Sequence, residues 1–346
     1  MEVGVADAAV SVRVTMDDVT QVGRARRAAL AVAADLGIHT DIAGNVGLVA
    51  TELATNLVRH AREGAILIRP LDQPQRRGVE MLAVDKGPGI RDVSAAMRDG
   101  YSTAGTSGTG LGAIRRISSE FDVYSSMDSG TVFMARLWDP NVVRPHPPTD
   151  DERYAVGAVC LPIAGETECG DAWVVEQRDA TVLVAVVDGL GHGHEAAVAS
   201  TQALRVVGER ADASPADIVQ AAHGPLRATR GAAIAVAKID RRSSEVQFAG
   251  IGNIAGSILG PTSTHSMASH SGIVGHQMRT VRQFAYTWPP RGYMVLHSDG
   301  LSARWRADAY PGLIGHDPAI VAAVLHRDFA RTRDDATVLV IHDAAD

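Results

Sequence analysis

The first part of the chain switches between helical and strand-like spacing of its apolar residues. Alternation in residues 10–14 (VSVRV) predicts a strand, and a period of three to four residues predicts a helix over residues 17–36 that ends at Gly37. Thr40 suits the cap of a second helix that runs through residue 61. Further strands are predicted at residues 65–69, 79–85, 121–126 and 131–138, around a short helix at 111–118. This order is typical of an α/β sandwich rather than of alternating βαβ units.

The second part of the chain is richer in strands. Apolar runs predict strands at residues 154–160, 172–177, 181–188, 232–240, 245–251, 293–299 and 336–342. A helix is predicted over residues 195–210, and two more begin where a capping residue precedes proline, at Ser214-Pro215 and Asp317-Pro318. The pattern fits two sheets flanked by helices.

A proline-rich segment separates the two parts. Residues 139–153 contain four prolines and have no apolar period, which is a linker composition. We therefore expect two domains, at residues 8–138 and 154–343, in an α+β chain.

Composition narrows the classes of partner. The chain is 46% hydrophobic and 21% charged, which is globular, and its net charge of −7 argues against nucleic acid or an anionic membrane as a partner. No signal peptide or membrane-spanning run is present, so we expect a cytoplasmic protein. Cys160 and Cys169 are expected to be reduced structural thiols. A homodimer is compatible with the sequence.

Three segments of the first part carry candidate chemistry. On the second helix, Glu52, Asn56 and His60 are spaced four apart beside an apolar stripe, although such a stripe alone is more often a solvated helix face. An aspartate, Asp85, ends a strand in the sequence DKGPGI, where its carboxylate can accept a hydrogen bond from an adenine amino group. The glycines of residues 105–112 (GTSGTGLG) open a helix whose free N–H groups can hold phosphates.

Together these segments resemble the GHKL ATP-binding family and, more closely, its RsbT-like switch-kinase branch. The resemblance covers residues 8–138 and implies a Bergerat-type α/β sandwich that binds ATP and Mg²⁺. It implies adenine recognition at Asp85, Mg²⁺ coordination by Asn56 and a base role for Glu52, with Thr131 near the adenine. The implied glycine contacts are Gly87, Gly89, Gly108, Gly110 and Gly112. One departure is Leu57, where many relatives carry alanine.

Acidic residues stand at strand ends throughout the second part. They are Asp171, Asp188, Asp299, and the pair Asp334 and Asp335. Two carboxylates about 4 Å apart repel by about 4 kcal/mol at an effective dielectric constant of about 20. Converging acids are therefore tenable only when they are protonated or bridged by cations, and oxygen ligands select Mg²⁺ or Mn²⁺. Two such ions can activate water against a phosphate ester.

The order GD, DG, SDG and DDATV resembles the PPM metal-dependent protein phosphatases, in the SpoIIE and RsbX branch. The resemblance covers residues 154–343 and implies an α-β-β-α sandwich that holds two Mn²⁺ or Mg²⁺ ions. It implies that Asp188 bridges the ions, that the Gly189 carbonyl binds one, and that Asp171 acts through water. Asp299 and Asp334 would hold the other ion, and Asp335 ranks lower.

Some features of the second part stay open. His192 and His194 form an H-x-H pair that could bind zinc, but no third nitrogen or sulfur ligand is in register. Arg153 is a weakly supported phosphate-binding candidate, and the segment TRGAAIAV (residues 229–236) replaces the threonine-rich segment of many relatives. Substrate contacts in that segment are therefore undetermined.

The two resemblances imply a bifunctional regulator of a bacterial stress or sigma-factor partner-switching pathway. Its second domain would dephosphorylate phosphoserine or phosphothreonine on a STAS-domain or stressosome-type partner, and its first domain would act as a serine/threonine kinase. The alternatives are a non-catalytic, nucleotide-gated docking module in the first domain, and a scaffold with both sites idle.

Overall fold

The chain folds as two compact units that do not follow the sequence order strictly. The computed structural model describes residues 10–73, 76–97, 110–141, 154–178, 181–261 and 263–343. The N-terminal unit comprises Ser11–Pro145 together with Arg306–Arg327. The remaining segments, His146–Trp305 and Asp328–Asp346 with Met1–Val10, form the C-terminal unit. Most of the expected linker, residues 142–153, lies outside the described residues.

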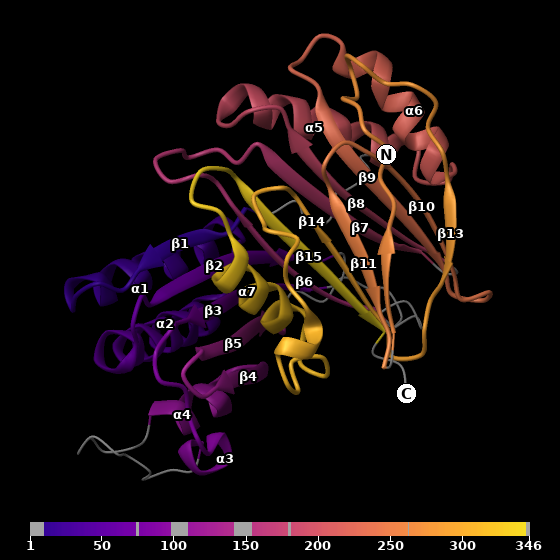
Figure 1. Cartoon of the computed structure of the whole chain (residues 1–346). Helices are drawn as coiled ribbons and strands as arrows, with labels where there is room; N and C mark the ends of the chain where they lie inside the picture. The colour runs from indigo at the N-terminus through magenta and orange to yellow at the C-terminus, as the bar shows by residue number, and fades with distance from the viewer. Residues whose placement is uncertain are drawn as a thin grey trace. The chain divides into compact units, whose positions relative to one another are not determined.

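The N-terminal unit is an antiparallel sheet with two long helices on one face (Figure 1). Its elements are β1 (Val12–Thr15), α1 (Thr20–Asp35), α2 (Thr40–His60), β2 (Ala65–Asp72), β3 (Arg77–Val84), α3 (Val93–Ala96), α4 (Gly110–Ile117), β4 (Glu120–Ser126) and β5 (Gly130–Asp139). The strand order is β1-β2-β3-β5-β4. Its core, between the sheet and α1, α2 and α4, includes Val46, Val49, Leu53, Ile66, Ile68, Met81 and Ile114. This arrangement confirms the predicted α/β sandwich.

The helix starts differ from the predicted ones. The cap of α2 is His39, whose side chain accepts the Asp41 N–H at 3.5 Å, so Thr40 is the first helical residue and not the cap. Helix α1 starts at Thr20, where the Asp18 carboxylate accepts the Thr20 N–H at 2.7 Å. At both helix starts, a side chain next to the predicted cap accepts a hydrogen bond from a free backbone N–H group. The observed first residue of each helix therefore differs from the predicted one by one to three residues.

A ladder of buried charges crosses the sheet. Arg69 pairs with Glu80, Glu80 with Arg136, and Arg136 with Glu120, each as direct cross-strand neighbours. The Arg136 Nε lies 2.7 Å from Glu80 Oε2, and the Arg69 Nη2 lies 3.0 Å from Glu80 Oε1. Burial would raise the pKa of Glu80, which is fully enclosed, but the two guanidinium groups outweigh burial and hold that pKa below its usual value.

The last member of this ladder comes from the far end of the sequence. Arg136 binds both carboxylate oxygens of Asp317 at 2.8 Å. Asp317 also caps helix α7 (Pro318–Phe329) by accepting the Ala319 N–H at 2.8 Å, and its own N–H donates to Asp122 at 2.8 Å. The capping role predicted for Asp317 is confirmed. These contacts fold Arg306–Arg327 into the N-terminal unit, although the sequence analysis expects that segment within the second domain.

The C-terminal unit is a sandwich of two sheets. Its elements are β6 (Tyr154–Leu161), β7 (Asp171–Arg178), β8 (Thr181–Gly189), α5 (His194–Glu209), α6 (Pro215–Leu226), β9 (Ala232–Asp240), β10 (Glu245–Ile251), β11 (Ala255–Leu259), β12 (Thr264–Met267), β13 (Phe284–Thr287), β14 (Tyr293–His297) and β15 (Ala336–Asp343), and the 3₁₀ turn η2 (Ala307–Ala309) lies in the other unit. The strand orders are β13-β10-β9-β8-β7 and β12-β11-β14-β15-β6.

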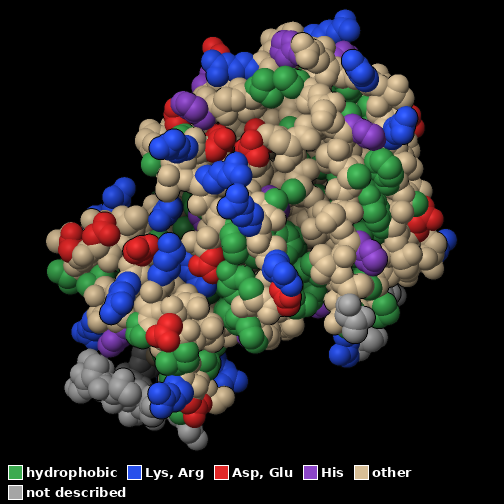
Figure 2. All heavy atoms as spheres, viewed as in Figure 1, with side chains coloured by type: hydrophobic (Ala, Val, Ile, Leu, Met, Phe, Trp, Pro, Cys, Tyr) green, Lys and Arg blue, Asp and Glu red, His purple; other side chains and the backbone are tan. Residues whose placement is uncertain are grey.

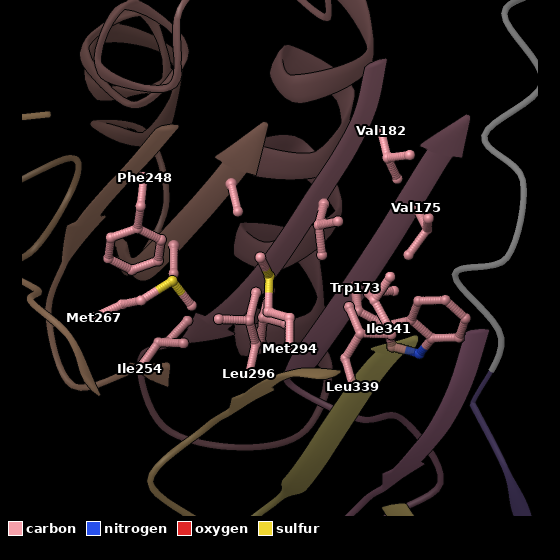
Figure 3. Close-up of a cluster of buried hydrophobic side chains, with 14 of the residues drawn as sticks. Trp173, Val175, Val182, Phe248, Ile254, Met267, Met294, Leu296, Leu339 and Ile341 are labelled. Atoms are coloured by element: carbon pink, nitrogen blue, oxygen red, sulfur yellow. The ribbon is translucent and has the colours of Figure 1, made fainter. Parts of the chain in front are cut away.

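The sandwich buries one core between its sheets and another beneath its helices. Trp173, Phe248, Met294 and Leu339 belong to the core between the sheets (Figure 3). Helices α5 and α6 cover the outer face of the β8-containing sheet through a second apolar cluster. Cys160 and Cys169 are buried thiols that are not joined in a disulfide, and their Sγ atoms lie 3.6 Å apart.

The sequence analysis missed three short strands, β11, β12 and β13. Strands β12 and β13 form the outer edges of the two sheets and are largely exposed, so their sequences THSM and FAYT lack an apolar run. Sheet edges need only one apolar face, and short strands give too few residues to establish a period.

Two surface features complete the description. No helix in the described part of the chain has both the length and the apolar character needed to cross a bilayer. On the face drawn in Figure 2, basic and acidic side chains are intermixed rather than gathered into areas of one sign.

We predict that Glu80→Gln destabilises the N-terminal unit by about 3–5 kcal/mol, because it leaves two buried guanidinium groups without their shared carboxylate. Chemical denaturation followed by circular dichroism measures this loss. The matched control is Glu63→Gln, which removes an exposed ion pair with Lys86 in the same unit and should cost less than about 1 kcal/mol. Equal shifts in the two variants would contradict a dominant role for the ladder.

Candidate functional site

The first candidate site begins on helix α2. Leu53 and Leu57 face the core and are 1% and 4% exposed, whereas Glu52 and Asn56 lie half-buried at the edge of that face. His60, the third residue of the predicted stripe, is exposed. The Asn56 side-chain nitrogen is buried and has no hydrogen-bond partner among the described residues. A buried amide without a partner is costly, so this position suits contact with a ligand.

The Asp85 carboxylate lies close to this helix. It is 7% exposed, and its Oδ1 accepts the Gly87 N–H at 2.5 Å. Burial raises the pKa of Asp85, although this backbone hydrogen bond opposes the shift. A Cβ placed on Gly87 would lie 2.7 Å from Asp85 Oδ1 and 3.4 Å from the carbonyl oxygen of His60. The loop after β3 is therefore packed against the end of α2.

Thr131 lies beside Asp85, as the resemblance implies. Its carbonyl accepts the Asp85 N–H at 3.0 Å, and its hydroxyl lies 2.9 Å from that of Ser125. Ser125 also accepts the Ile90 N–H at 2.7 Å, so it joins the glycine loop to β5. Ser125 was missed because only the β4–β5 register brings it to Thr131.

The glycines of this site have more than one role. Gly89 has φ +77°, and a Cβ there would lie 2.3 Å from the Ser126 carbonyl oxygen. The local backbone conformation and packing therefore require glycine at this position, whether or not a nucleotide is bound. Gly110 and Gly112 lie in the first turn of α4, as predicted. Gly108 lies outside the described residues. The described part therefore brings together α2, the Asp85 loop and Thr131.

The second candidate site lies at the ends of strands from both sheets of the sandwich. Asp171 on β7 and Asp188 on β8 are directly paired neighbours. Asp299 follows β14 and Asp334 precedes β15, and those two strands are paired in the other sheet. All four residues belong to the C-terminal unit.

Burial and neighbouring carboxylates both raise pKa values at this site. Burial, followed by the charges of Asp171, Asp299, Asp334 and Asp335, raises the pKa of Asp188 to about 8. Burial and the Asp299 charge also raise the pKa of Asp334. Carboxyl groups that disfavour one another's ionisation suit a site that is completed by cations.

Asp335 differs from the other acids. Its two carboxylate oxygens accept the backbone N–H groups of Ile163 and Gly170, each at 2.6 Å. These bonds make it a brace for the loop that carries Asp171, which supports its lower rank as a ligand.

Two neutral side chains orient the acids and were missed by the sequence analysis. The Ser298 hydroxyl donates to Asp171 Oδ2 at 2.6 Å, and the Asn253 amide donates to Asp299 Oδ2 at 2.6 Å. Ser298 directly precedes Asp299, a neighbourhood that could have drawn attention to it. Asn253 comes from a distant turn, so only the fold could identify it.

The Asp188 loop depends on close packing at Gly189. A Cβ there would lie 2.2 Å from the Ala196 carbonyl oxygen, and the Gly189 N–H donates to the Gly170 carbonyl at 3.1 Å. In the described part of the chain, no three His, Cys, Asp or Glu side chains already surround a single point as a complete metal-binding group.

The histidine pair points to separate partners. His192 Nδ1 lies 2.9 Å from Glu166, and His194 Nδ1 lies 3.0 Å from Glu168. Both rings are exposed, and each is paired with a different carboxylate. Arg153, the weak phosphate-binding candidate, lies outside the described residues.

Comparison with protein families assigns both halves of the chain. Residues 15–136 match the model described as Histidine kinase-like ATPase domain, and residues 178–342 match Stage II sporulation protein E (SpoIIE). Both resemblances inferred from the sequence are confirmed.

Individual relatives agree with this division. Serine/threonine-protein kinase RsbT of Bacillus subtilis (strain 168) is 35% identical over 114 residues, which cover 33% of this chain and 86% of RsbT. Phosphoserine phosphatase RsbX of the same organism is 23% identical over 139 residues, which cover 40% of this chain and 70% of RsbX. A solved structure described as "The bacterial stressosome: a modular system that has been adapted to control secondary messenger signaling" is 29% identical, with a TM-score of 0.52, and covers 55% of this chain and 100% of that one.

We predict that Asp188→Asn stabilises the cation-free protein and removes the stabilisation that Mn²⁺ provides. Because the pKa of Asp188 is raised to about 8 in the folded state, its contribution to stability falls as pH rises from about 4 to about 8. Removing the charge at pH 8 should therefore raise the free energy of unfolding by on the order of 1 kcal/mol, which corresponds to an increase of about 2–4 °C in Tm.

Thermal unfolding in a chelator and in Mn²⁺, at pH 6 and pH 8, measures both effects. Asp212→Asn, at a side chain that is 92% exposed in the same unit, is the matched control. A variant that is destabilised in chelator, or that gains as much from Mn²⁺ as the unmodified protein, would contradict the prediction.

Proposed function

We propose that this chain is a two-activity regulator of protein phosphorylation. It belongs to the histidine kinase-like ATPase family, in its RsbT branch, and it also contains a SpoIIE-family phosphatase domain. Its C-terminal unit removes phosphate from serine or threonine of a partner protein. Its N-terminal unit binds ATP and transfers phosphate to serine or threonine.

The convergence of four acids from two sheets carries the phosphatase proposal. The raised pKa of Asp188 supports a site whose charge is balanced by cations. The residues that would hold the ions are Asp188, the Gly189 carbonyl, Asp299 and Asp334, and Asp171 would contact them through water. Two Mn²⁺ or Mg²⁺ ions, when bound, would supply a water molecule activated for attack on phosphorus.

The residues around the acids act by orientation. Ser298 holds Asp171, Asn253 holds Asp299, and Asp335 fixes the loop before β7 through two backbone N–H groups. Because carboxylate positions decide where cations can lie, these neutral contacts preorganise the site.

The ATP site is supported by the Asn56 amide and the buried Asp85. The side-chain oxygen of Asn56 is of the kind that binds Mg²⁺, its unpartnered nitrogen can donate to the ligand, and the buried Asp85 carboxylate suits an adenine amino group. Glu52, one turn before Asn56 on the same helix, is the proposed base for the attacking hydroxyl. Gly87, Gly89, Gly108, Gly110, Gly112 and Thr131 complete the proposed nucleotide contacts.

The partner class follows from the relatives. RsbT is named as a serine/threonine-protein kinase and RsbX as a phosphoserine phosphatase, and this chain carries both kinds of domain. We propose a STAS-domain or stressosome-type phosphoprotein as the substrate of both activities.

A second candidate function is nucleotide control of the phosphatase without phosphotransfer. Arg327 near the end of α7 donates to the backbone carbonyl of Asp85 at 3.2 Å, within the N-terminal unit. Seven residues later the chain reaches Asp334. A nucleotide that shifts the Asp85 loop would therefore act on the segment that leads into a proposed metal ligand.

We predict that Asp299→Asn abolishes Mn²⁺-dependent phosphatase turnover, with a loss of more than about 100-fold, because a neutral amide weakens the hold on a divalent cation. The assay uses the full-length chain and a phosphorylated STAS protein, with mass spectrometry of both chains. Asp212→Asn is the control, and near-normal turnover in the Asp299 variant would refute the assignment.

We predict that Asp85→Asn weakens ATP binding by about 10–100-fold, because it replaces a charge-assisted hydrogen bond with a neutral one. Calorimetric titration of the full-length chain measures the change. Asp72→Asn, on the exposed end of β2, is the matched control. Unchanged affinity would exclude adenine recognition at Asp85.

Labelled ATP separates the two candidate functions. With a STAS protein, phosphotransfer that is lost in Glu52→Ala supports the kinase, whereas ATP binding without transfer favours the nucleotide-gated module. In the second case nucleotide should change the phosphatase rate, and the change should shrink in Arg327→Gln. Point variants are preferable to deletion of residues 1–140, because deletion would strip Arg306–Arg327 of its partners.

A further inference from the structure

The ligands assigned to the proposed metal site, all of them among the described residues, include no positively charged side chain. Asp171, Asp188, Asp299 and Asp334 carry four negative charges when ionised, which two divalent cations only cancel. A phosphorylated serine carries a charge of about −1.5 to −2 at pH 7. Additional positive charge at the mouth of the site would favour binding of that anion.

The turn that precedes β9 places one arginine near Asp188. Asp188 and Gly189 on β8 pair with Ala233 and Ala232 on β9. Arg230 lies two residues before Ala232, at the same end of the sheet as Asp188. The Leu190 N–H donates to the Gly231 carbonyl at 3.0 Å, which ties the loop after Asp188 to the residue next to Arg230.

The backbone at Arg230 is held in a defined turn. Gly231 has φ +81°, and a Cβ there would lie 2.7 Å from His276 and 2.8 Å from Val274, so the turn requires glycine. The Thr229 hydroxyl accepts the Gly231 N–H at 3.0 Å and donates to the Leu226 carbonyl at 2.8 Å. The side chain of Arg230 therefore starts from a rigid base.

The guanidinium lies over the metal-site loop. A Cβ on Gly191 would lie 2.8 Å from Arg230 Nη1, which places the guanidinium directly against that loop. The other terminal nitrogen pairs with Glu195 in the first turn of α5. The Arg230 side chain remains 48% exposed, so N–H groups are accessible to a substrate.

We propose that Arg230 binds the phosphate of the substrate in the phosphatase site, a role that rests on the proposed function. Its planar fork can donate two parallel hydrogen bonds to phosphate oxygens, with Glu195 holding it ready until substrate arrives. The segment TRGAAIAV, whose substrate contacts the sequence left undetermined, thereby provides the anion-binding group of the site.

A purely structural role makes a different prediction. If Arg230 only tethers α5 to the loop, removing either partner of the Arg230–Glu195 pair should have the same effect. If Arg230 binds phosphate, Glu195→Gln should leave phosphate binding within about 2–3-fold of normal, because an exposed pair contributes little.

The experiment uses the full-length chain with Mn²⁺ and p-nitrophenyl phosphate, and measures KM, kcat and inhibition by inorganic phosphate. Arg230→Gln should raise both KM and the phosphate inhibition constant by about 10–100-fold, the loss expected for a charge-assisted hydrogen bond. Arg230→Lys should recover part of that affinity, because it restores the charge but not the fork. Arg205→Gln, which removes an exposed pair with Glu209 on the same helix, should match the unmodified protein.

Three outcomes overturn the proposal. The first is that inhibition by phosphate is unchanged in Arg230→Gln. The second is that Glu195→Gln weakens this inhibition as much as Arg230→Gln does. The third is that Arg333→Gln, beside Asp334, weakens the inhibition and Arg230→Gln does not. Absence of Mn²⁺-dependent turnover in the unmodified chain would instead count against the proposed phosphatase function, so the two failures are distinguishable.

Discussion

Mutual repulsion among carboxylates at the ends of two sheets is the constraint on which the C-terminal unit depends. Asp188 sits among four other acids, and burial together with their charges raises its pKa to about 8. The fold keeps these acids together at an electrostatic cost, and the sandwich core and the backbone hydrogen bonds of Asp335 offset that cost. Clusters of mutually repelling carboxylates are typical of functional sites, because a bound cation relieves the repulsion and the relief adds to the affinity for the cation.

The N-terminal unit also contains a buried carboxylate, but there arginine side chains of the same sheet neutralise its charge. Glu80 is more deeply buried than Asp188, yet its pKa is lowered, because Arg69 and Arg136 flank it in the cross-strand register. The charges of the ladder are paired within the protein and have a structural role, whereas the acids around Asp188 are the ones that we propose bind cations. The two pKa values shift in opposite directions because Glu80 faces two guanidinium groups, whereas Asp188 faces other carboxylates.

The segment Arg306–Arg327 connects these two themes. Asp317 completes the buried ladder and caps α7, and Arg327 reaches the carbonyl of Asp85. The same segment lies in sequence between Asp299 and Asp334, two proposed metal ligands. The segment that contacts the Asp85 loop is therefore joined through the backbone to Asp334, and any coupling between the proposed nucleotide and metal sites would be reciprocal by linkage.

Apolar periodicity and short glycine and aspartate motifs are local signals, so they were enough to predict the two families and the long strands and helices, and to nominate the residues that we propose for both sites. The sequence did not determine the edge strands, the partners Ser298 and Asn253, or the position of Arg230, because these depend on strand register and on contacts between distant segments. The assignment of Asp317 to the N-terminal unit likewise required the tertiary structure. A buried ion pair forms only where packing excludes water from both partners, and no local pattern records which distant side chain will complete it.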